Sequence, residues 1–273
     1  LPKILGDLAL LFFLFLLLRQ HRLQFLAGTA VGPLDDDALE LRKADAVALA
    51  DVALGQTDTR YVPEDPAIRE AGIDESRPLD FRSPYGCSKG AADQYVLDYA
   101  RQYGLPAVVF RMSCIYGPSQ RGCEDQGWIA HFVASTIEGR GLTLFGDGKQ
   151  VRDTLFVDDL VRAMRRAVDA IDRTAGRAFN IGGGPERTLS LLELLATLET
   201  MHGRLPPVEY ADWRAADQRY YVSDTSRFQE ATGWGPRVEI AEGLERLYDW
   251  LRTDTTEQTP RRRPWPSPDP QYS

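Results

Sequence analysis

Segments with the pattern of buried strands alternate along this chain with segments that have the pattern of helices. The segment 105–117, LPAVVFRMSCIYG, is a mostly apolar run closed by Gly117 and Pro118, which is typical of a buried strand. A helical pattern precedes it, beginning at Pro84 and ending at Gly104. This alternation favours an α/β fold with a largely parallel sheet.

The same alternation continues toward the C-terminus. Residues 178–184, AFNIGGG, are expected to form a short strand that ends in three glycines. Ser190 and Glu193 have the spacing of a capping box at the start of a helix. Asp158 and Asp159 are expected to cap another. The apolar stripe expected for that helix is Leu160, Met164, Val168 and Ile171. The stripe of a last amphipathic helix is Ile240, Leu244, Leu247 and Leu251.

Other segments lack a clear periodicity. Residues 61–80 are rich in Pro, Glu and Asp, which predicts an irregular loop. Residues 253–273 are proline-rich and are expected to be a disordered tail. The apolar run Leu8–Leu18 is too short to cross a bilayer as a helix, so we expect no membrane partner. It fits either a buried core segment or an interfacial anchor. Because the chain begins without Met, a natural N-terminus is expected to be missing.

Charge and cysteine content exclude several function classes. A formal net charge of −8 argues against a nucleic-acid surface, although a few local arginines could still hold a small anion. The three cysteines are not spaced as a C-x-x-C motif, so we expect a reducing cytoplasm and no redox or zinc chemistry. The three histidines are far apart in the sequence, so we expect no metal site.

Two groups of residues could support chemistry. Tyr85 and Lys89 are four positions apart at a helix start and therefore lie on one face, although two ordinary surface residues would show the same spacing. In GDGKQVRDTLFVDD, two glycines precede Lys149 and Arg152, which suits a phosphate group or, equally, a β-turn with solvated charges. A later aromatic segment, WRAADQRYYVSD, adds two further arginines.

Five motifs occur in one order: SPYGCSKGAADQYVLDYARQYGLPAVVFRMSCIYGP, EDQGWIAHF, GDGKQVRDTLFVDDLV, AFNIGGG and YYVSDTS. Together they resemble the extended short-chain dehydrogenase/reductase superfamily, and specifically its NAD-dependent nucleotide-sugar epimerases. FRMSCIYGP followed by EDQGW is most similar to the CDP-paratose (CDP-tyvelose) 2-epimerase branch. The resemblance covers residues 61–252.

The resemblance implies a partial Rossmann-like, doubly wound parallel sheet with a smaller C-terminal α/β substrate-binding part. It divides the chain into an atypical N-terminal segment, 1–60, the epimerase part, 61–252, and the tail. It further implies a cytoplasmic isomerase that acts at C2 of a CDP-sugar through a transient keto intermediate, uses NAD and forms a homodimer.

The resemblance also implies roles for single residues. Tyr85 would be the catalytic acid/base, and Lys89 would favour its phenolate and hold the cofactor ribose. Tyr85, Lys89 and Met112 would be the cofactor-binding residues. The expected substrate-binding residues are Ser113 and Cys114 for the sugar and Arg152, Arg214 and Arg219 for the diphosphate.

The sequence departs from the family pattern at the cofactor. No G-x-x-G-x-x-G turn for the cofactor pyrophosphate is present. KILGDL, residues 3–8, matches a segment that follows the family's Ser or Thr partner, which would place that hydroxyl at or before Leu1. An inactive remnant or a sugar-nucleotide binding module therefore stays open beside the epimerase. A sugar-nucleotide 4,6-dehydratase is a rival within the enzyme class.

Overall fold

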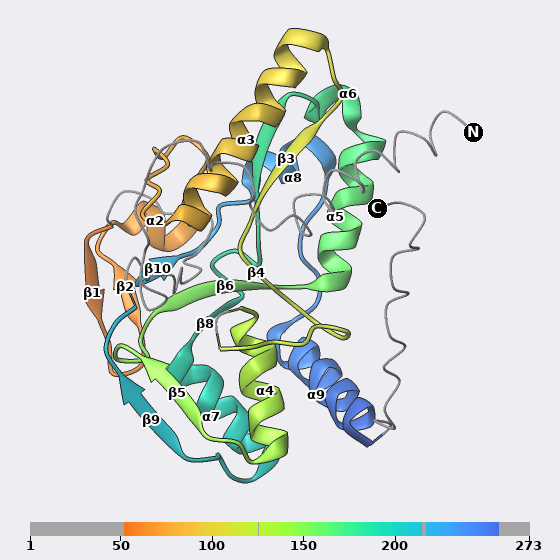
Figure 1. Ribbon diagram of the computed structural model, residues 1–273. Coiled ribbons are helices and arrows are strands. Elements are labelled where there is room, and N and C mark those ends of the chain that lie inside the picture. Colours follow the sequence, from red (N-terminus) through yellow and green to blue (C-terminus); the bar gives the residue numbers. More distant parts are fainter. Residues whose placement is uncertain (1–51, 125, 215–216, 257–273) are drawn as a thin grey trace, which may run out of the picture. The chain divides into compact units, whose positions relative to one another are not determined.

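The computed structural model describes residues 52–124, 126–214 and 217–256, all within the unit formed by residues 41–273 (Figure 1). The strands are β1 (Leu54–Gln56), β2 (Tyr61–Pro63), β3 (Val108–Met112), β4 (Cys114–Tyr116), β5 (Leu142–Phe145), β6 (Val151–Phe156), β7 (Arg177–Ile181), β8 (Thr188–Ser190), β9 (Val208–Ala211) and β10 (Tyr220–Tyr221). The helices are α2 (Pro66–Ala71), α3 (Pro84–Tyr103), α4 (Trp128–Glu138), α5 (Val157–Asp169), α6 (Ile171–Thr174), α7 (Leu191–His202), α8 (Ser226–Thr232) and α9 (Ile240–Thr256).

Parallel pairing dominates the sheets, as the alternating pattern predicts. β3 pairs with β7, β5 with β9, and β6 with both β4 and β10, each time in parallel. β8 is an antiparallel neighbour of β6, and β1 pairs antiparallel with β2. The expected α/β architecture with a largely parallel sheet is therefore confirmed.

The strand expected over residues 105–117 is two strands that change neighbours at Ser113. The Ser113 N–H donates to the carbonyl of Ile181 on β7 (3.0 Å), and its hydroxyl donates to the carbonyl of Asp153 on β6 (2.7 Å). β3 therefore runs beside β7 up to this residue, and β4 runs beside β6 after it. The prediction of one continuous strand was wrong because both of these partners lie far away in the sequence.

Two clusters of buried side chains form the core. One joins α4, α7 and α9 to β5 and β6, and contains Ile129, Leu144, Leu194 and Leu244. The other lies between α5, β7 and α8, and contains Leu155, Leu160, Phe179, Phe228 and Trp234. In this second cluster the Phe228 ring meets both Phe179 and Trp234 nearly edge-on, with ring centroids 5.2 and 5.5 Å apart.

The predicted face of α5 is partly wrong. Leu160 is buried as expected, but the other buried positions are Ala163 and Ala167, whereas Met164 and Val168 are 38% and 44% exposed. Small alanines allow the helix to lie close to its neighbours, and this close packing outweighs the larger apolar side chains. Asp159 does not cap the helix, because the buried carboxylate accepts backbone N–H groups from the loop before α9.

Helix ends were predicted more accurately than loops. Gly104 ends α3 in the left-handed conformation (φ 65°), and the capping box between Ser190 and Glu193 is present. The loop expected over residues 61–80 instead contains β2 and α2, because Asp65 accepts the N–H of Ala67 and thereby caps a short helix. The first residues of the expected tail are helical, since α9 continues to residue 256. The apolar run and KILGDL lie outside the described residues.

Candidate functional site

Tyr85 and Lys89 lie on the first turns of α3. Pro84 occupies the first helical turn, and the Ser83 side chain accepts the N–H of Gly86 (3.0 Å) and so fixes the start of the helix. The Lys89 Nζ lies over the Tyr85 ring, 5.4 Å from its centroid. Both side chains are half-buried. The two groups are therefore close enough for the ammonium charge to stabilise a phenolate.

An ion pair joins α3 to the neighbouring strand. Arg111 on β3 donates from Nε to Asp93 Oδ2 (2.7 Å), and the two side chains are only 10% and 9% exposed. Close to this pair, Gly90 lies against the Phe81 ring, and a Cβ at that glycine would come within 2.0 Å of it. Sequence reasoning missed these contacts. Arg111 inside the apolar run VVFRM was the available signal, since a charge buried in a strand needs a partner.

Met112, Ser113 and Cys114 form the junction between β3 and β4, and all three are half-buried. The Ser113 hydroxyl donates to the carbonyl of Asp153, which leaves its oxygen able to accept a hydrogen bond. The indole N–H of Trp128 donates to Cys114 Sγ (3.2 Å). These three adjacent residues lie at the carboxyl end of β3, the edge of a parallel sheet at which ligands of α/β proteins bind.

Arg152 is buried rather than solvated. Its Nη1 donates to the carbonyl of Val151 (3.0 Å), and its Nη2 donates to Asp217 Oδ1 (3.3 Å). Only 7% of the residue is exposed. The alternative of a turn with solvated charges is therefore wrong for this arginine. Lys149, by contrast, bonds to the segment after β1, donating from Nζ to the carbonyl of Thr57 (3.0 Å).

Arg214 and Arg219 lie against aromatic rings. The Arg214 guanidinium is 3.8 Å from the centroid of the Phe145 ring, at the end of β5. The Arg219 guanidinium lies 5.1 Å from the Trp213 ring and 5.6 Å from the Tyr61 ring. Stacking of this kind holds a guanidinium in place while its N–H groups stay directed outward.

Strand pairing connects these arginines. β10 pairs with β6 in the register Tyr221↔Arg152, and the backbone carbonyl of Arg219 accepts the N–H of Val151 (2.9 Å). Next to them, Gly146 (φ 79°) lies so close to the Trp213 ring that a Cβ would be 2.6 Å away. The turn between β5 and β6 and the segment 213–219 therefore lie together, and they form one arginine cluster.

Asp153, directly after Arg152, is a second residue that sequence reasoning missed. It is fully buried, and its Oδ2 accepts the N–H of Gly184 at the end of the three-glycine segment (3.1 Å). Burial raises the pKa of this carboxyl, although hydrogen bonds from Ser113, Gly184 and Ser223 oppose the shift. Burial, together with the charge of Asp153, also raises the pKa of Tyr220 to about 12. The carboxylate joins β6 to the segment after β7.

A family model agrees with the geometry of the site. The model of the NAD dependent epimerase/dehydratase family matches residues 42–182, which is more than half of the chain. This chain belongs to that family. The match includes Tyr85, Lys89, the β3–β4 junction and Arg152. The predicted family, and NAD as the cofactor on which the family depends, are therefore confirmed.

Individual relatives give a consistent result. The chain is 43% identical over 200 residues to CDP-paratose 2-epimerase of Salmonella typhi, covering 71% of this chain and 58% of the relative. It is 38% identical over 177 residues to dTDP-glucose 4,6-dehydratase of Streptomyces griseus, covering 64% and 52%. UDP-glucuronic acid 4-epimerase of Bacillus cereus, solved in complex with UDP-glucuronic acid and NAD, has a TM-score of 0.61 at 27% identity, covering 66% and 56%.

The solved relative confirms the Rossmann-like fold class. The chain spans little more than half the length of the curated relatives that it matches. Among the described residues, no helix has the length and apolar character needed to span a membrane. Within the same ranges, no cluster of His, Cys, Asp and Glu side chains is arranged to bind a metal ion.

Proposed function

We propose that this chain provides the catalytic and substrate-binding residues of an NAD-dependent epimerase that acts at C2 of a CDP-sugar. The observation that carries the proposal is the Tyr85–Lys89 pair, half-buried at the start of α3, with Lys89 Nζ over the phenol ring. The 43% identity to a CDP-paratose 2-epimerase supports the position and the nucleotide. Membership of the family supports transient oxidation as the chemistry.

Tyr85 exchanges the proton in this proposal. Its phenolate takes the proton of the sugar hydroxyl and later returns it, and the Lys89 ammonium stabilises the phenolate in between. NAD, when bound, supplies a hydride acceptor and, in the return step, a hydride donor. Because the keto form can present either face to the returning hydride, the configuration at the carbon inverts without net redox change.

The described residues fit one end of the cofactor. Tyr85, Lys89 and Met112 lie at the helix start and the strand end, where a hydroxyl and an ammonium can hold a ribose and Met112 can contact the nicotinamide. The pyrophosphate end needs closely spaced backbone N–H groups, and the sequence has no G-x-x-G-x-x-G turn. The proposal therefore assigns to these residues only the nicotinamide-ribose end.

The substrate contacts the other residues of the site. Arg152, Arg214 and Arg219 bind the diphosphate, because guanidinium groups match its oxygens and form charge-assisted hydrogen bonds. Ser113 accepts or donates a hydrogen bond at the sugar, and Cys114 forms the pocket wall beside Trp128. Stacking on Phe145, Tyr61 and Trp213 holds two of the three guanidiniums in place before the substrate binds.

A second candidate is a sugar-nucleotide binding module that no longer holds NAD. The absence of a glycine-rich turn from the sequence favours it, whereas the intact Tyr85–Lys89 pair favours the enzyme. The dehydratase similarity keeps a 4,6-dehydratase as the rival enzyme. That chemistry needs an additional acid pair beside the family's Ser or Thr hydroxyl, and LPKILGD does not supply one.

Calorimetry and turnover separate these candidates. We expect NAD+ and CDP to bind, a CDP-sugar to be epimerised, and Tyr85→Phe to abolish turnover while CDP affinity stays unchanged. Binding of CDP without NAD+ would identify the binding module instead. Full activity in Tyr85→Phe would refute the acid/base role, and unchanged CDP affinity in Arg219→Ala would refute the diphosphate assignment.

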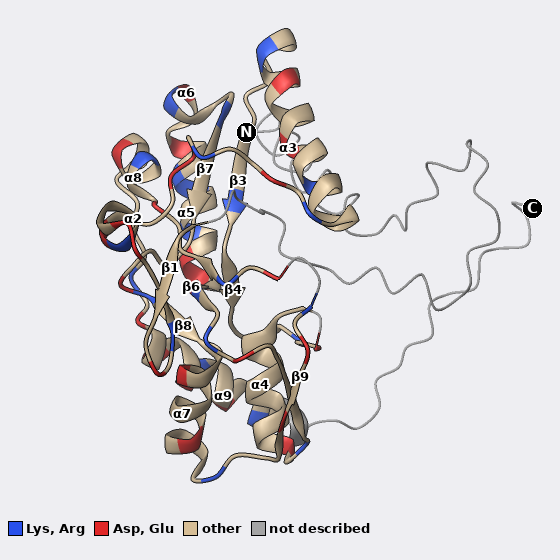
Figure 2. Ribbon diagram, turned by 90° about the vertical axis from the view of Figure 1, so that its left-hand side faces the viewer, with Lys and Arg blue, Asp and Glu red and all other residues tan. Residues whose placement is uncertain are grey.

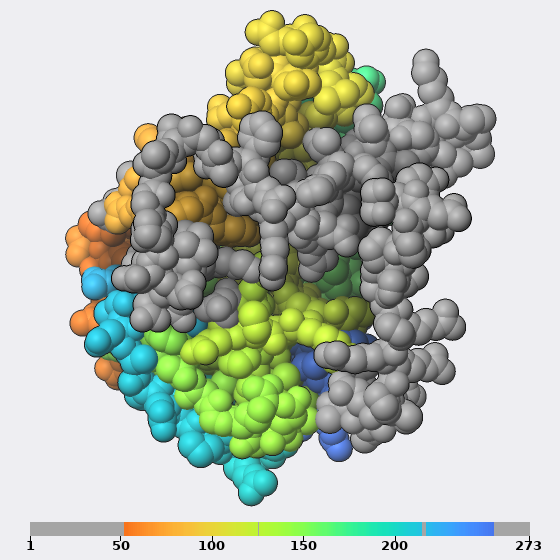
Figure 3. Space-filling view, in the orientation of Figure 1, coloured from red at the N-terminus to blue at the C-terminus, as the bar shows by residue number. Residues whose placement is uncertain are grey.

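Homodimerisation through α3 is part of the proposal. Tyr95, Tyr99 and Tyr103 recur every four residues along this helix and are 68%, 53% and 75% exposed. The C-terminal half of α3 lies uncovered at the edge of the face shown in Figure 3. A dimer would bury these rings, so Tyr99→Arg should shift sedimentation to a smaller species. The three free cysteines are consistent with the proposed cytoplasmic location.

A further inference from the structure

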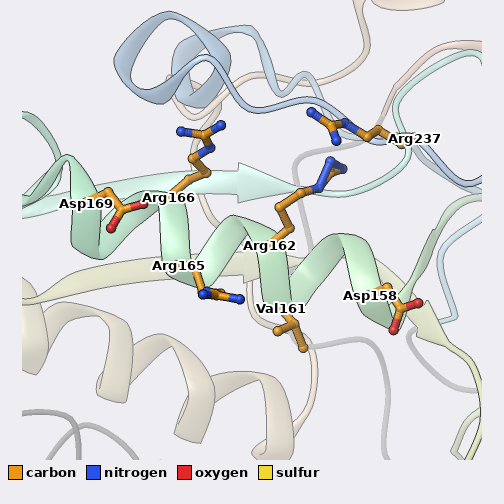
Figure 4. A pocket seen from close by; sticks show the side chains of 7 residues that line it. All are labelled: Asp158, Val161, Arg162, Arg165, Arg166, Asp169 and Arg237. Carbon is orange, nitrogen blue, oxygen red and sulfur yellow. The ribbon is translucent and has the colours of Figure 1, made fainter. Parts of the chain in front are cut away.

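Four arginines line an open cavity of about 500 Å³ along α5 (Figure 4). They are Arg162, Arg165, Arg166 and Arg237. The chain as a whole carries a formal net charge of −8, and Figure 2 shows charges of both signs spread over its other helices. A local excess of arginine therefore stands out from the rest of the surface. The proposed epimerase site uses none of these residues.

Asp159 holds two of the arginines side by side. Its buried carboxylate accepts an N–H from Arg162 through Oδ1 and the backbone N–H groups of Arg237 (2.8 Å) and Val238 (2.9 Å) through Oδ2. Arg162 also donates from Nη2 to the carbonyl of Gly235 (2.7 Å). One carboxylate thus fixes the Arg162 guanidinium and the backbone at Arg237, so this part of the cavity is preorganised.

Like charges are crowded around this point. Arg166 follows Arg162 by one helical turn, and Figure 4 shows both on the side of α5 that faces Arg237. Burial lowers the pKa of Arg162, and the charges of Arg237 and Arg166 lower it further, although Asp159 opposes the shift. Within residues 52–124, 126–214 and 217–256, the side chains of Arg166 and Arg237 have no ion pair or hydrogen bond. A bound anion would relieve this repulsion.

The carboxylates around the cavity do not neutralise it. Asp158 lies at one end and pairs with Arg246 on α9 (3.4 Å). Asp169 lies at the other end of α5. Asp159 is already bonded to Arg162. The middle of the cavity therefore keeps an excess of positive charge, with room for a ligand of a few heavy atoms between two acidic ends.

We propose that Arg162, Arg166 and Arg237 form a binding site for a diphosphate, either free pyrophosphate or the diphosphate of a nucleotide. Guanidinium groups match phosphate oxygens in pairs, and several together favour an anion with more than one charge. A long nucleic acid would meet the acidic remainder of the surface and be repelled. This site lies outside the arginine cluster of β6 and β10, and it does not depend on the proposed epimerase function.

Calorimetric titration of the full chain with sodium pyrophosphate at low chloride tests the site. We expect binding that weakens as potassium chloride is added, and Arg166→Ala and Arg237→Ala should each weaken it about tenfold, which corresponds to one charge-assisted hydrogen bond. Both side chains are exposed, so the variants should fold normally. Arg204→Ala, an exposed arginine outside the cavity, is the matched control and should bind like the wild type.

A parallel titration of Arg219→Ala separates this site from the proposed substrate site. Loss of pyrophosphate binding in Arg166→Ala but not in Arg219→Ala would support the proposal even if the chain epimerises no sugar. Loss in Arg219→Ala alone, or no pyrophosphate binding by the wild type, would overturn it. Competition by CDP at the Arg166-dependent site would identify a nucleotide as the source of the diphosphate, and its absence would identify free pyrophosphate.

Discussion

The layer formed by α3 and β3 differs sharply from the region around β6 in how it is held together. All six residues of β6 are buried, whereas none of the five residues of β3 is. Of the 20 residues of α3, only Gly86, Gly90 and Leu97 are buried. The candidate catalytic pair therefore lies on the element with little apolar burial, and its position depends on a few specific contacts.

This contrast explains which contacts matter in each region. Around β6, apolar side chains from α4, α7 and α9 stabilise the fold by burial, and no single polar contact is decisive. In the α3 layer, the Arg111–Asp93 ion pair and the close approach of Gly90 to Phe81 replace much of that burial. Disturbance of the first region should unfold the protein, and disturbance of the second should displace the candidate site.

The largest effect is expected from a cavity in β6. Leu155→Ala removes a fully buried side chain and should lower the free energy of unfolding by about 3–5 kcal/mol. Val109→Ala, the matched change in the half-buried β3, should cost only about 1 kcal/mol. Urea denaturation measures both values. Equal losses would mean that the two regions are equally well packed.

The second largest effect is expected from the ion pair. Asp93→Ala leaves the Arg111 guanidinium buried without its partner and should cost about 3 kcal/mol. Amide hydrogen exchange should accelerate mainly along α3. Asp80→Ala is the control, because its pair with Arg82 is exposed on both sides and should be worth less than about 1 kcal/mol. Uniform acceleration across β6 would contradict a local role for the pair.

The same contrast decides what could be predicted from the sequence. The bounds of α3 follow from Pro84 and Gly104, and the capping box at Ser190 follows from spacing, because these signals are local. The break at Ser113 was not predictable, since it depends on hydrogen bonds to Ile181 and to the Asp153 carbonyl.

For the candidate site, residue types were easier to predict than their surroundings. The Tyr85–Lys89 spacing placed the two groups on one face of a helix, as the structure has them. The ring stacking of Arg214 and Arg219 and the burial of Arg152 depend on packing between strands that are distant in the sequence. A pattern of residues does not encode such distances.

A smaller, pH-dependent effect is expected at Asp153. Burial raises the pKa of this carboxyl in the folded state, so folding favours its protonated form. Its contribution to stability is therefore complete at acidic pH and is lost as pH rises through the folded-state pKa. Relative to the wild type, Asp153→Asn should become more stable as pH rises from about 4. Asp98→Asn, an exposed position on α3, should show no such trend in urea unfolding at several pH values.

The smallest effects are expected from two matched helix caps. Ser190→Ala removes the cap of α7, which packs in the main core, and should lower the free energy of unfolding by about 1 kcal/mol. Ser83→Ala removes the equivalent hydrogen bond to Gly86 at the start of α3. Because α3 is held weakly at this end, its first turn can fray without global unfolding. The urea midpoint should then move less than in Ser190→Ala, while the Gly86 amide exchanges faster. Equal midpoint shifts in the two variants would show that α3 unfolds together with the β6 region, and that the Tyr85–Lys89 pair shares the stability of the core.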